Sequence, residues 1–303
     1  MSYNCHAMAE QTGIYIGTSG WSYPRGEGTW KGHFYPGGKL DELEYYSRFF
    51  NTVEINSSFY RPPSPQTAKS WAARVPDGFI FSAKLWQKFT HPAMYQQATG
   101  DQAVISARDV DVFKTGLEPL AEQDKLGALL AQFPPSFKND AMGQRMLAAV
   151  GCTFAGYNLA VELRHRSWSD DPATAQRLAD IKAAWVHIDE PKFSSSIAAE
   201  LPQTADMAYF RFHGRNAADW WQGDNETRYR YLYSDDEITQ LAQRMTAAGR
   251  QAKLMFAFFN NHWQGYAPRN AVSMIKALKL PVKEIPIQPS LEAEEDSRDE
   301  ALG

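Results

Sequence analysis

Thr52-Val-Glu-Ile-Asn-Ser-Ser-Phe-Tyr60 is a strand-forming stretch that carries a carboxylate toward the interior of the protein. Successive side chains of a strand point to opposite faces, so Glu54 and Asn56 share one face while Val53 and Ile55 share the other. Burying an ionised group is costly unless the group is paired, and a carboxylate is therefore rarely placed in a core for packing alone. The stretch predicts a buried strand that points polar groups at a shared interior.

Strand-forming stretches alternate with helix-forming stretches along the rest of the chain. Eight strands with helices between them are the count of a closed barrel, so the sequence predicts an α/β fold with a single (β/α)8 TIM barrel. The expected strands are Ile14–Gly17, Thr52–Ser57, Phe79–Lys84, Leu126–Gln132, Leu159–Arg164, Ala184–Ile188, Met207–Phe212 and Lys253–Phe259. Amphipathic spacing, prolines near helix starts and a glycine at a helix end predict helices over Lys39–Phe50, Pro172–Ala183, Asp235–Ala248 and Pro268–Leu280.

Two connections are longer than a barrel requires and are expected to form irregular extra loops. One covers residues 85–116 after the third strand, with a single short helix, and the other covers residues 214–234 after the seventh strand. Long loops without a core of their own are commonly lids or binding loops. Both follow the carboxyl ends of strands, where barrel enzymes build their sites. We therefore expect both loops to flank the functional site.

Length and composition predict one domain. A chain of 303 residues with 44% hydrophobic residues can bury a large core. We expect this domain over residues 14–288, between a flexible N-terminal tail over 1–13 and a disordered acidic tail over 289–303. Residues 290–303 contain six acidic residues and one arginine, a local charge of −5, so the remainder sums to +1 within the total of −4. This near-neutral core permits a nucleic-acid partner but does not favour one.

The number of cysteines and the hydropathy of the chain predict its cellular location. Cys5 and Cys152 are the two cysteines of the sequence, which provides no disulfide framework and fits a reducing compartment. No stretch of the sequence has the apolar length of a bilayer span, and the first dozen residues lack the basic and apolar parts of a signal sequence. The sequence therefore predicts a soluble cytoplasmic protein without a membrane partner, and it leaves the oligomeric state open.

A series of short motifs follows the predicted strands in order. They are Gly17-Thr-Ser-Gly20-Trp21, Trp30-Lys-Gly32-His-Phe34-Tyr35-Pro36, Val53-Glu54-Ile-Asn56-Ser-Ser-Phe59-Tyr60, Phe81-Ser-Ala-Lys84, Gln132-Phe-Pro134, Glu162-Leu-Arg164, Arg211-Phe-His213-Gly214 and Asn260-Asn261. Together they resemble the YecE-like family over residues 14–280. The resemblance implies a TIM barrel independently of the strand count. Because that family is a domain of unknown function, the resemblance implies no reaction, substrate or cofactor.

The expected strand phase gathers polar side chains at the carboxyl ends of the strands. Lys84, Arg164 and Arg211 are expected to form a cationic cup, because guanidinium groups suit the geometry of phosphate and carboxylate. The sequence thus predicts a small anionic ligand, with a phosphorylated one favoured, and hydrolysis or proton-transfer chemistry. The candidate catalytic acids and bases are Glu54, Glu162 and His213. The candidate ligand-binding residues are Trp21, Asn56, Tyr60, Lys84, Gln132, Arg164, Arg211 and Asn260.

Two other interpretations stay open. A metal-assisted phosphodiesterase or nuclease-like hydrolase would use Glu54, Glu162, Asp189 and a histidine, and the expected phase of the sixth strand points His187 and Asp189 inward. Nearby cations oppose a divalent metal, so no metal ligand is assigned. A non-enzymatic anion-binding or scaffold barrel would instead hold Glu54 and Glu162 in an interior salt-bridge network. No glycine-rich nucleotide loop occurs in the sequence, which disfavours a nicotinamide or nucleoside-triphosphate cofactor.

Overall fold

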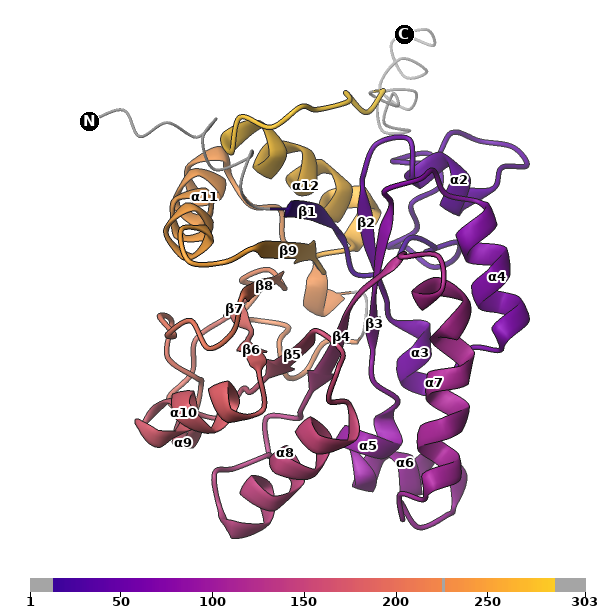
Figure 1. Ribbon diagram of the computed structural model, residues 1–303. Coiled ribbons are helices and arrows are strands. Elements are labelled where there is room, and N and C mark those ends of the chain that lie inside the picture. Colours follow the sequence, from indigo (N-terminus) through magenta and orange to yellow (C-terminus); the bar gives the residue numbers. More distant parts are fainter. Residues whose placement is uncertain (1–12, 225–226, 287–303) are drawn as a thin grey trace, which may run out of the picture.

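The computed structural model describes residues 13–224 and 227–286, arranged as in Figure 1. The tails expected over residues 1–13 and 289–303 lie outside the described residues, except that Gly13 already begins the first strand. The strands are β1 Gly13–Thr18, β2 Thr52–Ile55, β3 Ile80–Lys84, β4 Leu126–Gln132, β5 Leu159–Glu162, β6 Ala183–Trp185, β7 His187–Asp189, β8 Met207–Phe212 and β9 Leu254–Phe259.

The strands form two sheets with parallel pairing throughout. One sheet has the order β1-β9-β8-β7 and the other the order β2-β3-β4-β5-β6. Helices connect the successive strands except β6 to β7 and β7 to β8, and they pack around the outside of the sheets (Figure 1). Parallel strands need such crossovers, because the chain must return to the same end before the next strand begins. The chain is therefore an α/β protein with parallel sheets.

The sixth expected strand, Ala184–Ile188, is divided between the two sheets. β6 pairs with β5, and β7 pairs with β8 in the other sheet. Val186 alone separates β6 from β7, and its backbone N–H donates to the carbonyl oxygen of Val161 at 3.0 Å. The chain therefore passes directly from one sheet into the other at Val186.

A glycine and a tyrosine hydroxyl join β1 to β2. A Cβ atom added to Gly17 would lie 2.1 Å from the carbonyl oxygen of Thr52, so only glycine permits this approach of the two strands. The hydroxyl of Tyr46 accepts from the Thr18 N–H at 2.8 Å and donates to the Thr52 carbonyl oxygen at 3.0 Å. One residue further along, Ser19 and Glu54 form a parallel backbone bridge. The two sheets are thus in contact at this edge as well.

The helices predicted from the sequence occur with shorter or shifted bounds. Lys39–Phe50 contains only a short helix, whereas Asp235–Ala248 agrees within one residue, because Ser234 and Glu237 form a capping box at its start. Within the described residues, no helix is both long and apolar enough to cross a membrane. The helices are α2 Glu42–Tyr46, α3 Ser57–Tyr60, α4 Pro65–Ala73, α5 Gln87–Thr90, α6 Pro92–Thr99, α7 Ala107–Ala121, α8 Ala141–Thr153, α9 Arg166–Ser169, α10 Ala173–Asp180, α11 Asp235–Gly249 and α12 Tyr266–Ala277, with 3-10 turns η1 Thr227–Tyr229 and η2 Trp263–Gly265.

The expected loop over residues 85–116 is wrong, because this segment is largely helical. It contains α5, α6 and most of α7, which continues beyond it to Ala121. Gly116 and Pro119 obscure the α7 pattern in the sequence. Gly116 has a packing reason, since a Cβ atom there would lie 2.2 Å from the Pro63 carbonyl oxygen. The segment after β8 is less regular, and the described part of it contains only the turn η1.

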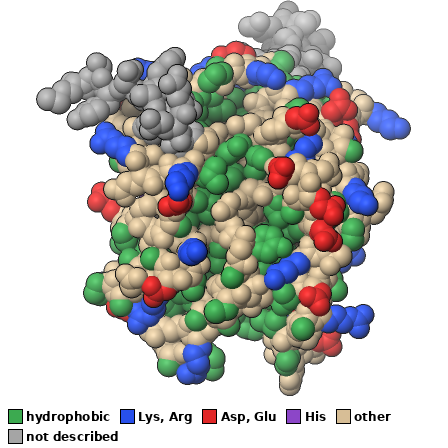
Figure 2. All heavy atoms as spheres, in the orientation of Figure 1, with side chains coloured by type: hydrophobic (Ala, Val, Ile, Leu, Met, Phe, Trp, Pro, Cys, Tyr) green, Lys and Arg blue, Asp and Glu red, His purple; other side chains and the backbone are tan. Residues whose placement is uncertain are grey.

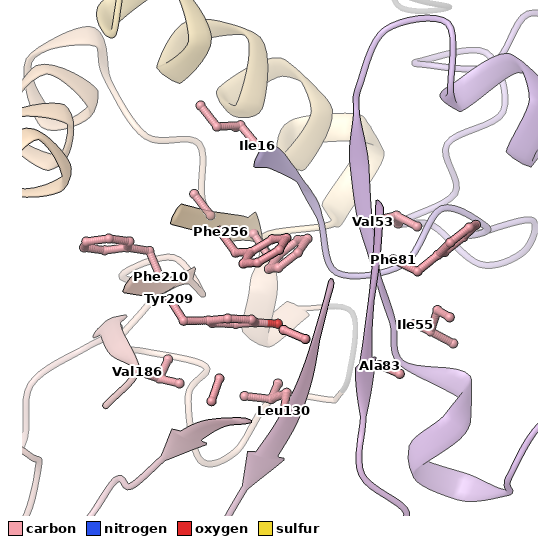
Figure 3. Close-up of a cluster of buried hydrophobic side chains, with 14 of the residues drawn as sticks. Ile16, Val53, Ile55, Phe81, Ala83, Leu130, Val186, Tyr209, Phe210 and Phe256 are labelled. Carbon is pink, nitrogen blue, oxygen red and sulfur yellow. The ribbon is translucent and has the colours of Figure 1, made fainter. Parts of the chain in front are cut away.

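One hydrophobic core is shared by both sheets. Its buried residues include Ile16 from β1, Val53 from β2 and Phe256 from β9. Figure 3 shows Tyr209 pointing from β8 toward the centre of this core, between Phe256 and Leu130. On the outer surface, the face in Figure 2 mixes Lys and Arg with Asp and Glu around a central hydrophobic region. Several buried residues of the strands are polar exceptions to this core, among them Glu54, Glu162 and Arg211.

Candidate functional site

Buried polar side chains from both sheets meet at the carboxyl ends of the strands. Glu54 on β2 is the register partner of Ser82 on β3, and Gln132 on β4 is the register partner of Glu162 on β5. Arg211, on β8 of the other sheet, is within hydrogen-bond distance of both glutamates. Glu54 and Glu162 are 0% exposed and Arg211 is 2% exposed, so these charges are withdrawn from water. Such burial is tolerated only when each charge is compensated.

Both carboxylate oxygens of Glu54 have donors. Oε1 accepts from the Ser19 hydroxyl at 2.8 Å and from Arg211 Nη2 at 2.7 Å. Oε2 accepts from the Tyr209 hydroxyl at 2.7 Å, and that hydroxyl lies 2.8 Å from Ser82 Oγ. Arg211 therefore neutralises Glu54 while the two hydroxyl groups complete its hydrogen bonding.

Glu162 continues a chain of alternating charges. Its Oε2 accepts from Arg211 Nη1 at 2.6 Å and its Oε1 accepts from Arg164 Nε at 2.7 Å. Arg164 Nη1 in turn lies 3.4 Å from Glu190 Oε2. Burial alone would raise the pKa of Glu162, but the guanidinium groups of Arg211 and Arg164 hold it well below its usual value. We call Glu54, Arg211, Glu162, Arg164 and Glu190 the interior ion network.

His213 is held neutral against this network. Burial, and then the positive charge of Arg211, lowers the pKa of His213 to about 3. Its Nε2 lies 3.2 Å from Arg164 Nη2 and its Nδ1 lies 3.0 Å from the Asn260 side-chain amide. As placed, both neighbouring groups are donors, and a neutral imidazole accepts a hydrogen bond at only one of its two nitrogens. Because its pKa lies far below neutrality, His213 is poorly suited to carry protons at neutral pH.

Lys84 differs from the other cations of the site. Among the described residues, no ion pair or hydrogen bond involves its ammonium nitrogen, which lies 3.9 Å from the ring centroid of Phe59. The side chain keeps partial contact with solvent. Burial, followed by the positive charge of Arg211, lowers the pKa of Lys84 to about 7. Amine and ammonium forms of Lys84 therefore coexist at neutral pH.

Lys125 is a buried lysine whose ammonium, in contrast to that of Lys84, has hydrogen-bond acceptors among the described residues. It is 7% exposed, and its Nζ donates to the carbonyl oxygens of Ala72 at 2.8 Å and Val75 at 3.1 Å. The ammonium thereby exchanges water for protein acceptors, which is the usual condition for burying a charge. Lys84 lacks acceptors of this kind in the described part of the chain. Its amine is consequently available to a ligand.

Glu190 is a second titratable group at this end of the sheets. It is 6% exposed, and its Oε2 has no hydrogen bond among the described residues apart from the longer approach of Arg164. Burial raises the pKa of Glu190, and the nearby Arg164 only partly opposes this rise. Glu162 and Glu190 are thus two carboxyl groups on the same guanidinium whose pKa values are displaced in opposite directions.

The predicted ligand-binding residues divide into two groups. Lys84, Gln132, Arg164, Arg211 and Asn260 lie at the polar end of the strands, within the ion network or beside it.

The remaining predicted ligand-binding residues are Trp21, Asn56 and Tyr60, whose contacts are with other parts of the structure. Trp21 packs edge-on against Trp71, with ring centroids 5.7 Å apart. Tyr60 is 66% exposed and borders a surface hollow beside α4 and α7. Asn56 precedes α3 without capping it. Their role in ligand binding therefore stays a prediction.

The predicted inward direction of His187 and Asp189 is wrong by one residue. His187 stacks on Phe210 with ring centroids 4.7 Å apart and borders a cavity under α11. Asp189 pairs with Arg215, whose Nη2 lies 2.8 Å from Oδ2, and accepts from the Tyr233 hydroxyl at 2.8 Å. The carboxylates of the proposed metal site are therefore separated, and no group of three metal-ligating side chains occurs in the described chain.

Sequence reasoning missed several residues of the site. Tyr209 and Ser82 share the strand phase of Arg211 and Lys84, so alternation alone could have identified them. Glu190 was hidden by the phase error in the sixth strand. Phe59, which was not among the candidates, lies under the Lys84 ammonium. No signal in the sequence could show that the Lys84 nitrogen has no acceptor, because that depends on which carboxylates the arginines occupy.

The fold and site define a class of α/β proteins whose parallel strands carry a buried ion network at their carboxyl ends. The family model described as "Protein of unknown function DUF72" matches residues 15–295. The chain belongs to this family, and the resemblance to YecE-like proteins is confirmed.

Two curated relatives are similar to the chain. UPF0759 protein YunF of Bacillus subtilis is 29% identical over 283 residues, which cover 88% of this chain and 95% of YunF. UPF0759 protein YecE of Escherichia coli is 30% identical over 156 residues, about half of each protein.

Two solved structures of DUF72 family proteins are also similar. The protein from Thermotoga maritima has a TM-score of 0.76 and 35% identity, covering 88% of this chain and 99% of that one. The protein from Enterococcus faecalis has a TM-score of 0.77 and 26% identity, covering 91% and 99%. These relatives support the fold and the family, and their printed names give no reaction.

Proposed function

We propose that the chain binds a small anionic ligand at the carboxyl ends of its strands and catalyses proton transfer on it. The observation that carries this proposal is the ammonium of Lys84, which is largely enclosed yet has no anionic partner among the described residues. A phosphate or carboxylate group of a ligand would supply the missing counter-charge. Arg211 and Arg164 are already neutralised by glutamates, so Lys84 is the cation that first meets the ligand.

The protonation states favour proton transfer over hydrolysis. Glu162 is strongly held in its ionised form, which makes it a weak base for activating water. Lys84 and Glu190 are better acid and base candidates, because the pKa of Lys84 is lowered to about 7 and that of Glu190 is raised. An ideal catalytic group titrates near the working pH. In this proposal Glu54 and Glu162 position Arg211 and Arg164, and His213 is held neutral beside them.

A ligand screen tests the binding step. Unfolding temperatures would be measured with inorganic phosphate, glycerol 3-phosphate and pyruvate, because native-state binding at 100 times Kd stabilises by about 2.7 kcal/mol. We expect a shift in the wild type that is lost in Lys84→Met and retained in Lys69→Met, an exposed charge control on α4. The affinity should fall as the pH rises through about 7, since the ammonium is then lost. An equal shift in wild type and Lys84→Met would contradict the proposal.

A non-enzymatic anion-binding or scaffold protein is the second candidate. It is favoured by the complete hydrogen bonding of the Glu54 and Glu162 carboxylates, which is what a purely structural network requires. The two candidates differ in the fate of a bound ligand. Incubating a bound ligand in D2O should introduce deuterium at an acidic carbon if proton transfer occurs. Recovery of the ligand without deuterium at any pH between 6 and 9 would favour the scaffold.

We also propose that the two sheets act as one closed (β/α)8 barrel. Supporting this are the bridge between Ser19 and Glu54 at one junction and the direct passage of the chain through Val186 at the other. Arg211, on one sheet, binds glutamates on β2 and β5 of the other sheet, which fits such closure. A crystal structure with continuous strand pairing between β1 and β2 would test it, and a solvent-filled gap there would contradict it.

A further inference from the structure

We propose that Lys84 is a nucleophile that forms an imine with an aldehyde or ketone carbon of its anionic ligand. The proposal deepens the function given above, because it uses the same site and identifies the ligand as a small anionic carbonyl compound, such as a 2-oxo acid or a phosphorylated aldehyde. The geometry that carries it is an enclosed amine at the carboxyl end of β3, without an acceptor in the described chain and facing the ring of Phe59 at 3.9 Å.

The contrast with other lysines of the chain supports this reading. Lys125 is buried and donates to two carbonyl oxygens, and Lys88 pairs with Asp109 at 2.9 Å. In both cases the nitrogen directs its N–H groups at protein acceptors. Lys84 is enclosed beside the cationic groups of Arg211 and Arg164 instead, and a neighbouring positive charge together with desolvation is a known way to activate an amine.

The chemical step needs no reagent beyond the carbonyl compound. The Nζ lone pair of Lys84 attacks the carbonyl carbon, and the C–O π electrons move to oxygen, which takes a proton. The nitrogen then loses its proton, the hydroxyl group takes a second proton and leaves as water, and the C=N bond forms. Nothing is oxidised or reduced. Glu190, a carboxyl group with a raised pKa at the same end of the sheets, suits the exchange of these protons.

Reductive trapping tests the inference directly. The full-length protein would be incubated with pyruvate or with glyceraldehyde 3-phosphate, reduced with sodium borohydride, digested and mapped by mass spectrometry. We expect one adduct at Lys84, equal in mass to the carbonyl compound less one water plus the two hydrogens of reduction. At pH 7 roughly half of Lys84 is amine, against fewer than about one in a thousand of an ordinary lysine. Its occupancy should therefore exceed that of any other lysine at least tenfold.

Matched variants and a second assay separate this inference from the proposed function. Lys84→Arg keeps a cation for anion binding but cannot form the imine, so it should retain stabilisation by phosphate and lose the adduct. The wild-type adduct at Lys84 should reach half its maximum near pH 7, whereas labelling of Lys125 should stay at background. Stabilisation by phosphate with adducts spread evenly over surface lysines would overturn the imine and leave anion binding standing. Neither stabilisation nor an adduct at Lys84 would overturn both.

Discussion

Arg211→Met should lower the free energy of unfolding by about 4 kcal/mol, because Arg211 neutralises two buried carboxylates at once. Its Nη2 lies 2.7 Å from Glu54 Oε1 and its Nη1 lies 2.6 Å from Glu162 Oε2, with the three side chains at most 2% exposed. Removing one partner of a buried pair costs roughly 3–5 kcal/mol, since the remaining charge is left uncompensated. Tyr209 and Arg164 still donate to the two carboxylates, so we expect a loss within this range and not twice as large.

The assay is equilibrium unfolding in urea at pH 7, followed by fluorescence of the nine tryptophans. Arg166→Met is the matched control, because Arg166 forms an exposed ion pair with Asp170 in which the side chains are 56% and 54% exposed. Such an exposed pair contributes little to stability. If Arg211→Met and Arg166→Met differed by less than about 1 kcal/mol, the claim that the network stabilises the fold would be refuted.

Acid provides a second check on the same variant. The pKa of Glu162 is lowered in the folded protein, so its stabilising contribution is present above the unfolded value of about 4.3 and is lost as the pH falls below it. Without Arg211 the pKa of Glu162 is lowered less, and less stability remains to be lost in acid. The difference between wild type and Arg211→Met should therefore narrow below about pH 4.3. A difference that stayed constant to pH 3 would show that Arg211 does not act through this carboxylate.

Three further perturbations test other parts of the structure. The pKa of Lys84 is lowered to about 7, so the unfolding free energy of the wild type relative to Lys84→Met should rise between about pH 7 and 10, by up to about 1.4 kcal/mol per pH unit. Urea titrations at several pH values would measure this, and a difference in unfolding free energy that does not change with pH would contradict the lowered pKa. The pKa of His213 is lowered to about 3, so its imidazole should remain neutral at pH 5 by NMR, whereas titration near 6.5 would exclude the burial described here. Gly17→Ala should cost about 1–3 kcal/mol in urea unfolding because its Cβ would meet the Thr52 carbonyl oxygen, whereas Gly37→Ala, with nothing within 4 Å, should cost far less.

Much of the fold was predictable because hydrophobic alternation and helix starts are local properties. The strand over Leu126–Gln132 has its expected bounds, because its apolar run is short enough for a buried strand and too short for a typical helix. The prediction of a single sixth strand was wrong, because the passage of the chain between the two sheets at Val186 depends on the neighbouring strands. In this segment every second residue from Val186 to Glu190 faces inward. The prediction was off by one residue, so it made the outward-facing His187 a candidate and left out the buried Glu190.

The residue types of the site were predictable, but their roles were not. Glu54, Glu162 and Arg211 were expected as acid, base and anion binder from their chemistry, and the structure engages them with one another. Pairing of this kind depends on distances between strands across the sheets, and the spacing of residues along the sequence does not predict these distances. The availability of the Lys84 amine could not be predicted for the same reason, because it arises when arginines already pair with the nearby carboxylates.

The pairing of two glutamates with two arginines in the network explains how Lys84 serves both binding and chemistry. The charges of Glu54 and Glu162 balance those of Arg211 and Arg164, so the Lys84 pKa is set first by burial, with smaller contributions from these neighbours. With a pKa near 7, the ammonium and amine forms of Lys84 are almost equal in free energy at pH 7. The ammonium attracts an anionic group, and the amine can attack a carbonyl carbon. A lysine paired with a carboxylate would keep its proton, and a fully exposed lysine would be amine too rarely to react. Both proposals therefore depend on an unpaired lysine beside arginines that glutamates already neutralise.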